Sequence, residues 1–286
     1  MPDDKPLNKW RVLVLAASRG PNEPMALAYG VSHKCLIEVG GKPMLARVVE
    51  TLLSHEKIGS IGVCIENREV LETALGSLLK QNSDRVQFYP SKNSAPASVL
   101  ASLQTMNDEA QAEGRDRGPV LVTTADHALL DQQMLDHFLS AAQKTEADLL
   151  VGLARAEIIL AAYPHAKRTF VTFGADRVSG CNLFGFMTPR AEKVLDFWQQ
   201  IEKNRKNPLK LVAAFGIKAL ATYMFGVLFG KNSLAKAFDV ASKRIGVTAK
   251  PVLLPFANAA VDVDKPEDKE LVEEILAQRQ RLPAGQ

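Results

Sequence analysis

The sequence is poor in cysteine and histidine, the residues from which disulfide frameworks and zinc sites are built. It has three cysteines, Cys35, Cys64 and Cys181, and five histidines among 286 residues. Because the cysteines are odd in number and lie far apart, we expect neither a disulfide framework nor a zinc site. The histidines show no metal-ligand spacing. These absences favour a protein of the reducing cytoplasm.

The chain also lacks a strong excess of charge of either sign. Its formal net charge is only +3, and no stripe of arginines and aromatics is visible. This pattern argues against a nucleic-acid-binding protein and is compatible with an anionic substrate. The first ten residues, MPDDKPLNKW, are polar and carry acids, so they do not resemble a signal peptide.

One apolar segment, residues 209–230, is long enough to raise the question of a membrane span. Lys210 and Lys218 interrupt it, and a lysine near the middle of a span is costly in lipid. Several glycines break it up further. We therefore expect a packed pair of helices, with a homodimer contact or a membrane-surface contact as the alternative.

The remaining sequence alternates between apolar runs and amphipathic segments. With 47% hydrophobic residues, it can bury the core of a single domain spanning residues 1–286. Such alternation is typical of an α/β fold with a mostly parallel sheet flanked by helices. A helical insert is expected at about 190–247. The expected strands are 11–16, 61–65, 86–89, 120–124, 148–153 and 252–255, and the expected helices are 43–55, 68–81, 97–113, 131–144 and one from Pro266.

The loop after the first strand has the character of a phosphate-binding loop. Small residues let backbone N–H groups approach an anion closely, and a lysine supplies a movable positive charge. Lys34 is the first candidate for that charge and Lys42 the second, with a surface loop and solvated lysines as the alternative. Neither the P-loop pattern nor the GxGxxG pattern is present. The candidate nucleotide-binding residues of the loop are Leu15, Ala16, Ala17, Ser18, Arg19 and Gly20.

The segments LAASRG and HKCLIEVGGKPML resemble the opening of the MobA-like nucleotidyltransferase superfamily, which typically reads LAAGxGxR, a lysine and then VxGKP. The resemblance implies a Rossmann-like sheet of the GT-A type, a nucleoside triphosphate substrate, Mg²⁺ as cofactor and a phosphorylated small-molecule acceptor. Ser18 stands where the family usually has glycine, and the stretch from Gly20 to Lys34 is longer than usual. A non-catalytic nucleotide-binding module therefore stays open as an alternative.

Two acidic motifs extend the resemblance. Asp126 ends the strand in VLVTTADHALL, where a helix cap is the alternative interpretation. The resemblance assigns it to a metal, and Mg²⁺ prefers one or two carboxylates together with phosphate oxygens. AAVDVDKPED resembles the family's late D-[IV]-[DG]-T-P-E-D element, which supplies the second metal ligand. Asp262 and Asp264 alternate along an extended run and so face the same side; we favour Asp262.

Two further segments are candidates for substrate contacts. SAPASVLASL resembles the segment that reads the nucleobase, which places Ala95 and Ser98 beside the base or the phosphates. Capping of the following helix by Ser94 or Ser98 is the alternative. VSGCNLFGF resembles the substrate-side element, with Gly180 and Asn182 as candidate acceptor contacts; an asparagine that satisfies a turn is the alternative.

Just upstream, Lys167 and Arg168 are expected to be a solvated pair rather than a phosphate contact. On the strand that ends at Asp126, the residues that follow lack the second aspartate of an Asp-x-Asp motif. A glycosyltransferase is therefore less favoured than a nucleotidyltransferase.

Together the motifs imply nucleotidyl transfer, in which an acceptor phosphate attacks the α-phosphorus of a nucleoside triphosphate and pyrophosphate leaves. Lys34, Asp126 and Asp262 are the expected catalytic residues, and Lys42 is expected to steady the acceptor phosphate or the loop. CTP with a sugar or polyol phosphate is favoured. Guanylyl transfer to a cofactor precursor, such as molybdopterin or a cobinamide phosphate, is the next alternative.

Overall fold

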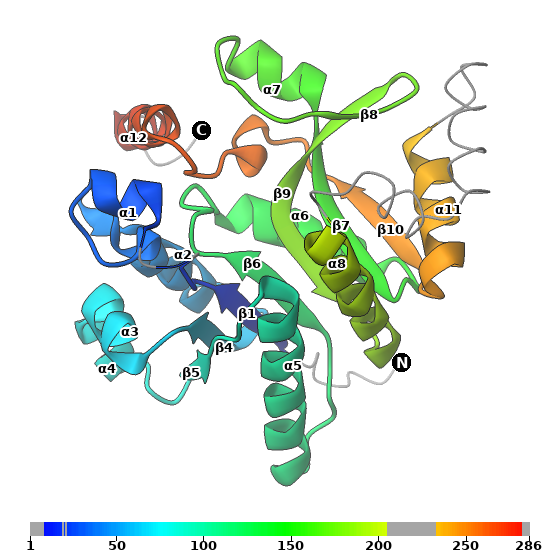
Figure 1. The fold of residues 1–286 in the computed structure, drawn as a ribbon, viewed down its shortest axis with the longest axis horizontal. Coiled ribbons are helices and arrows are strands. Elements are labelled where there is room, and N and C mark those ends of the chain that lie inside the picture. Colours follow the sequence, from blue (N-terminus) through cyan, green and yellow to red (C-terminus); the bar gives the residue numbers. More distant parts are fainter. Residues whose placement is uncertain (1–8, 19, 21, 205–232, 282–286) are drawn as a thin grey trace, which may run out of the picture.

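The computed structural model describes residues 9–18, 20, 22–204 and 233–281. Within these ranges an eight-stranded sheet has the order β10-β7-β9-β6-β1-β4-β5, and β8 pairs with β9 beside it (Figure 1). Neighbouring strands are parallel except where β9 pairs with β6, β7 and β8. The strands are β1 (Trp10–Leu15), β4 (Ile58–Ile65), β5 (Val86–Pro90), β6 (Val120–Thr124), β7 (Leu149–Arg155), β8 (Val171–Phe173), β9 (Asp176–Phe186) and β10 (Ala249–Leu253).

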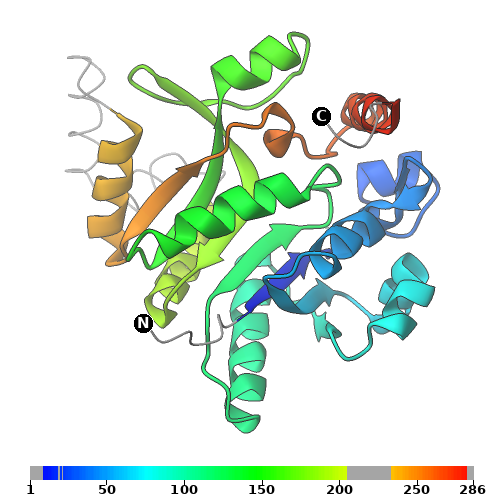
Figure 2. The ribbon, with the colours of Figure 1, turned by 180° about the vertical axis from the view of Figure 1, so that it is seen from behind.

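Helices cover both faces of this sheet, as Figures 1 and 2 show from opposite sides. Side chains alternate along β1: Val12 and Val14 pack in a cluster with α2, α3 and α6, whereas Leu13 packs in a cluster with α5 and α8. The strand is buried on both faces, which explains its unbroken apolar run. The helices named here are α2 (Met44–Leu53), α3 (Arg68–Leu75), α5 (Ala95–Ala112), α6 (Gln132–Gln143) and α8 (Lys193–Asn204).

A third apolar cluster joins the beginning and the end of the chain. It packs α1 (Pro24–Ala28) and the hairpin of β2 (Glu38–Val39) and β3 (Lys42–Pro43) against α12 (Pro266–Arg281). Val261 and Val263 are fully buried in this cluster. The segment that carries the late acidic motif is therefore anchored beside the loop that follows β1.

The register of the parallel strands aligns their carboxyl ends. Leu15, the last residue of β1, lies opposite Cys64 of β4 on one side and opposite Thr124 of β6 on the other. The loops that follow these strands therefore share one rim of the sheet, the edge at which open α/β sheets bind ligands.

The expected α/β fold with a mostly parallel sheet is confirmed, and the expected helices need three corrections. The helix expected over 68–81 is divided at Gly76, where φ is +51°, into α3 and α4 (Ser77–Gln81). Glycine takes this left-handed conformation at little cost, and it ends the first helix. The helix expected from residue 97 begins at Ala95, and the loop after β1 contains α1, which the sequence did not predict.

The expected helical insert is described only at its two ends, as α8 and α11 (Leu234–Ile245). The segment 209–230, for which a packed pair of helices was expected and a homodimer or membrane-surface contact was the alternative, lies outside the described residues. In the part of the chain that the structure describes, no helix has both the length and the apolar character needed to span a membrane. Between β7 and β9 lies α7 (Ala156–Ala162).

Candidate active site

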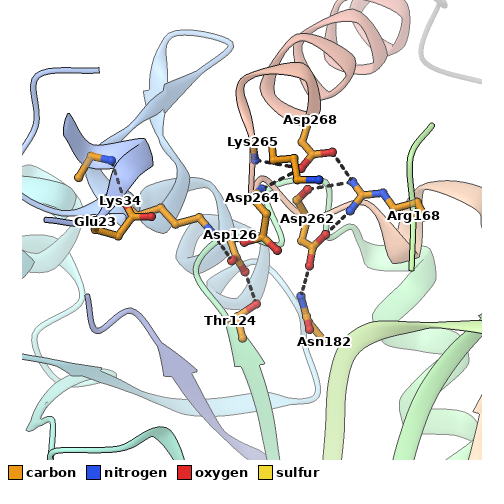
Figure 3. Close-up of polar contacts among 11 residues, drawn as sticks. Glu23, Lys34, Thr124, Asp126, Arg168, Asn182, Asp262, Asp264, Lys265 and Asp268 are labelled. Atoms are coloured by element: carbon orange, nitrogen blue, oxygen red, sulfur yellow. Dashed lines mark hydrogen bonds and ion pairs between the residues drawn. The ribbon is translucent and has the colours of Figure 1, made fainter. Parts of the chain in front are cut away.

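A lysine held between two carboxylates forms the centre of the candidate site. Lys34, in the short helix η1 (Lys34–Leu36), places Nζ 2.6 Å from Asp126 and 2.5 Å from Asp264. Figure 3 shows these side chains meeting between the end of β6 and the segment before α12. Three residues predicted from separate motifs thus come together on the rim of the sheet.

Asp126 is fixed from two directions. The Thr124 hydroxyl donates a hydrogen bond to its Oδ1 at 2.5 Å. The backbone carbonyl of Asp126 accepts the N–H of Val263 at 3.2 Å, which ties the end of β6 to the late acidic segment. Its side chain is 20% exposed, so it is largely shielded from solvent yet accessible to a ligand. A carboxylate oriented in this way needs little rearrangement to bind a cation.

The charge of Lys34 is secured by its neighbours. Burial by itself lowers the pKa of Lys34, but the carboxylates of Asp126 and Asp264 outweigh this effect and raise it. Lys34 therefore stays positively charged at neutral pH. Its side chain is 17% exposed, so an anion that binds at the rim can reach the ammonium group.

The side chains of Asp262 and Asp264 are partly exposed, whereas Val263 between them is fully buried, a pattern that agrees with the expected alternation. They nevertheless bind different cations. Asp264 contacts Lys34, whereas Asp262 forms an ion pair with the guanidinium of Arg168 (Figure 3). The second oxygen of Asp262 accepts a hydrogen bond from Asn182 Nδ2 at 3.3 Å.

A bulge in β9 aims Asn182 at this carboxylate. The pairing of β7 with β9 shifts between Val151 and Leu153, and Asn182 in the shifted stretch has a φ of +50°. Bulges re-aim side chains and are common beside active sites. Asn182 is therefore brought to the site, although its contact there is Asp262. Gly180 lies on the same strand and is exposed, and a Cβ added to it would meet nothing within 4 Å.

The three carboxylates of the site repel one another. Burial raises the pKa of Asp262, Arg168 opposes the rise, and the charges of Asp126 and Asp264 reinforce it. Like charges gathered at one point favour the arrival of a further cation. Since all the donor atoms are carboxylate oxygens, the set suits a hard cation such as Mg²⁺.

These carboxylates do not by themselves form a complete metal cage. Over the described ranges, no group of three or more His, Cys, Asp or Glu side chains is arranged to hold a metal ion. Mg²⁺ commonly keeps several ligands from water and phosphate, so one or two carboxylates from this set would be enough for a phosphate-bound ion.

The loop after β1 is bound by the carboxylate of Glu66, which belongs to none of the motifs. The backbone N–H of Ser18 donates to Glu66 Oε1 at 2.5 Å, and Glu66 Oε2 lies 3.3 Å from His33 Nε2. Across the loop, the Ser18 hydroxyl donates a hydrogen bond to the Gly20 carbonyl and accepts one from the Gly20 N–H. Arg19, predicted to bind nucleotide, lies outside the described residues. Glu66 follows β4 on the same rim, and that position was the signal by which it could have been found.

Ser98 shapes the neighbouring loop. Its hydroxyl accepts the N–H of Lys92 at 2.8 Å, and the side chain is buried. The helix cap is Ser94, whose Oγ accepts the N–H of Ala97 at 3.4 Å. The first residue of α5, Ala95, is exposed on the rim. Ser98 therefore fixes the backbone of the loop that precedes α5.

Lys42 is placed differently from the other candidates. It lies in β3, its side chain is 51% exposed, and its ammonium group pairs with Glu50 of α2 at 2.8 Å. This arrangement agrees with the alternative of a solvated lysine. The pair of Lys167 and Arg168 was expected to be solvated, and for Arg168 that prediction is wrong, because its side chain is only 7% exposed.

The sequence that builds this site matches a known protein family. Residues 12–182 match the model of the MobA-like NTP transferase domain, and this stretch holds most of β1, its loop, Lys34, Asp126 and Asn182. The match covers more than half of the chain. The chain therefore belongs to the MobA-like NTP transferase family and is a nucleotidyltransferase. A search of curated proteins found no match.

Solved structures share the fold over more than 90% of the chain. A hypothetical transferase from Thermus thermophilus has a TM-score of 0.70 at 26% identity, over 91% of this chain and 99% of its own. The 4-diphosphocytidyl-2C-methyl-D-erythritol synthase of Anaerococcus prevotii has a TM-score of 0.53 at 12% identity, over 94% and 97%. The synthetase of CMP:2-keto-3-deoxy-manno-octonic acid, complexed with CTP, has a TM-score of 0.53 at 14% identity, over 95% and 99%. At the lower identities the likeness is one of fold.

Proposed function

We propose that this nucleotidyltransferase moves a nucleoside monophosphate from CTP to a phosphorylated sugar or polyol and releases pyrophosphate. The observation that carries the proposal is the meeting of Lys34 with Asp126 and Asp264 on the carboxyl-end rim of the sheet. This arrangement sets a positive charge against carboxylates beside the loop that follows β1. The choice of CTP is supported by two similar solved structures, whose names include diphosphocytidyl and CMP products.

The acidic side chains fit a divalent metal. Asp126, with Asp262 or Asp264, would hold Mg²⁺, which would supply charge neutralisation to the phosphates of the bound substrate. An oxygen-only donor set of this kind does not suit softer metals. The family match agrees with a metal-dependent reaction.

The protein's own contribution is positioning and charge. The backbone of residues 16–20 and the ammonium group of Lys34 would bind and orient the triphosphate. In the displacement, the acceptor's phosphate oxygen forms a bond to the α-phosphorus as the bond to the pyrophosphate oxygen breaks. Lys34 would stabilise the charge that gathers on the phosphates. No covalent enzyme intermediate is required.

Ala95 and the backbone fixed by Ser98 are proposed to lie at the base, and Gly180 and Asn182 at the acceptor. Gly180 is exposed, and the space where a side chain would begin there is open to 4 Å, which leaves room for a substrate to approach that strand. Lys42 is proposed to act on the loop through its hairpin rather than to touch the acceptor, because it pairs with Glu50.

A thermal-shift screen with CTP, GTP, UTP and ATP, each with and without Mg²⁺, tests the nucleotide. Binding to the native state raises the unfolding midpoint by mass action. We expect the largest shift with CTP and Mg²⁺, and its loss in Asp126→Ala. Asp136→Ala is the matched control, since Asp136 is an exposed carboxylate paired with Lys57 on a different part of the surface.

Pyrophosphate release with a panel of sugar and polyol phosphates then tests the reaction. A shift with GTP alone, together with turnover of a cofactor precursor, would replace the cytidylyl proposal with the guanylyl one. A shift without turnover of any acceptor would contradict the proposed reaction while leaving the nucleotide site in place.

A further inference from the structure

Arg168 joins three parts of the chain through one buried guanidinium. Its Nη1 group forms an ion pair with Asp262, and its Nη2 group donates to the backbone carbonyl of Asp262 at 2.9 Å. The same Nη2 lies 3.3 Å from Asp268 Oδ1, in the first turn of α12. Figure 3 shows the guanidinium facing both carboxylates from the loop that precedes β8.

Asp268 carries this contact on to the segment that bears Asp264. Its second oxygen accepts the backbone N–H groups of Asp264 and Lys265, each at 3.0 Å. This is the reciprocal half of a helix-capping arrangement, in which an acid of the first turn reaches back to the residues before the helix. Arg168 therefore holds the side chain that in turn holds the backbone of Asp264.

The burial of Arg168 requires a reason. An arginine side chain that is only 7% exposed is costly unless its charge is balanced and its donors are bonded. Two carboxylates balance the charge, and together with a carbonyl they bind both terminal nitrogens, while Nε is buried without a hydrogen-bond partner among the described residues. The planar fork of arginine reaches all three acceptors at once, which a lysine would not do. A contact of this kind is expected to be permanent rather than exchanged for a substrate.

The two acids of the late motif consequently differ in availability. Asp262 has one oxygen on Arg168 and the other on Asn182. Asp264 is more exposed, with 47% of its side chain accessible, and it contacts Lys34, which also contacts Asp126. The sequence favoured Asp262 as the metal ligand, whereas the contacts favour Asp264.

We infer that Arg168 is the positioning residue of the metal site: it clamps Asp262 and Asp268 so that Asp264 joins Asp126 as the metal-binding pair. The inference rests on the proposed function, in which a divalent cation binds at these carboxylates. Asp262 then serves as the partner of Arg168 and not as a metal ligand.

Titration with Mn²⁺, followed by its electron paramagnetic resonance signal, tests the clamp without reference to activity. Loss of a residue that orients a metal ligand typically weakens metal binding about 10- to 100-fold. We expect that loss in Arg168→Gln, and a smaller loss in Arg168→Lys, which keeps the charge without the fork. Asp264→Asn should weaken Mn²⁺ binding more than Asp262→Asn. Arg155→Gln is the matched control, because it removes an ion pair to Asp176 elsewhere.

The double variant Arg168→Gln/Asp262→Asn separates positioning from charge balance. It removes both charges of the buried pair, so it also guards against a single variant that unfolds. If Arg168 orients the segment, the double variant binds Mn²⁺ as weakly as Arg168→Gln. Recovery of wild-type affinity would show that Arg168 only neutralises Asp262 and would overturn the inference.

Asp126→Asn distinguishes this inference from the proposed function. Mn²⁺ binding that is lost in Asp126→Asn but unchanged in the Arg168 variants would overturn the positioning role alone. Mn²⁺ binding that is absent from the wild type, or equal in Asp126→Asn, would overturn the metal site and both proposals with it.

Discussion

Lys34 Nζ and Asp126 Oδ2 lie 2.6 Å apart, although 92 positions separate the two residues in the sequence. Asp264 approaches the same ammonium group from the other end of the chain. In the proposed metal site, the lysine thus occupies the position on these carboxylates that a divalent cation would take. We therefore expect the ammonium group and a metal to compete for the same carboxylate oxygens.

Lys34→Met should have opposite effects on the binding of Mn²⁺ and on the binding of CTP. Removing the ammonium group leaves the carboxylates less neutralised, so the affinity for Mn²⁺ alone should rise about threefold to tenfold, corresponding to about 1 kcal/mol. The affinity for CTP should fall at least about tenfold, because a charge-assisted contact to phosphate is lost. Calorimetric titration measures both constants.

Lys57→Met is the control for this substitution, since Lys57 pairs with the exposed carboxylate of Asp136 at 3.6 Å. It should leave both affinities unchanged. Weaker Mn²⁺ binding in Lys34→Met would contradict the competition between the lysine and the metal.

Glu66→Gln should tighten triphosphate binding. The negatively charged carboxylate of Glu66 accepts the N–H of Ser18, in a loop that is proposed to bind phosphate. Neutralising a partly exposed carboxylate removes about 1 kcal/mol of repulsion, so KM for CTP should fall about fivefold. Steady-state kinetics with Glu69→Gln as control, an exposed acid in the first turn of α3, measures the difference. A raised KM with altered base preference would instead place Glu66 at the nucleobase.

The contrast between Lys34 and Glu66 shows what the sequence could and could not predict. The carboxyl ends of parallel strands share one rim, so the position of Asp126 after a strand was enough to place it near the loop that follows β1. Which charged side chains contact the loop after β1 depends on the residues that meet across that rim in the folded protein. Nothing local in the sequence pairs Ser18 with Glu66, or Arg168 with Asp262 and Asp268.

The helices also divide into features that the sequence pattern predicts and features that it does not. Amphipathic spacing predicted α2, α5 and α6, because each buries one face against the sheet. The break at Gly76 depends on a left-handed φ that glycine permits but does not require. The helix α1 has five residues, too few to show a periodicity, although Glu23 caps it and Met25 and Ala26 are buried.

Asp148→Asn should lower stability in a pH-dependent way. Asp148 is buried and accepts hydrogen bonds from the Thr188 hydroxyl at 2.5 Å and the Thr248 N–H at 2.8 Å. Burial raises the pKa of Asp148, but these hydrogen bonds outweigh it and hold the pKa below its ordinary value. The folded state therefore stabilises the ionised form, and this stability is present above pH about 4 and is lost as pH falls through the folded pKa.

At pH 7 the asparagine variant should be less stable by about 1–3 kcal/mol, the worth of hydrogen bonds to a charged group. Urea unfolding at pH 7 and pH 3 measures this difference, which should shrink at the lower pH. Asp136→Asn, at a side chain that is 59% exposed, should show no comparable change. A destabilisation that is the same at both pH values would contradict the role of the ionised carboxylate.

Asn182 should distinguish backbone conformation from hydrogen bonding in one pair of variants. Its φ of +50° is left-handed, and its Nδ2 donates to Asp262 at 3.3 Å. Asn182→Gly keeps the backbone relaxed and loses only the hydrogen bond, whereas Asn182→Ala also strains the bulge. We expect Asn182→Ala to be less stable than Asn182→Gly by about 1 kcal/mol, the cost of a left-handed conformation for a residue with a Cβ.

Chemical denaturation measures the two free energies of unfolding, and acceptor KM with kcat reports on the site. Both variants should raise the acceptor KM to the same extent, because both free one oxygen of Asp262 on the face proposed for the acceptor. Equal stability of the two variants would mean that the bulge relaxes when the side chain is removed. An acceptor KM that rises only in Asn182→Ala would attribute the effect to the strained strand, and the amide of Asn182 would then have no part in holding the acceptor side of the site.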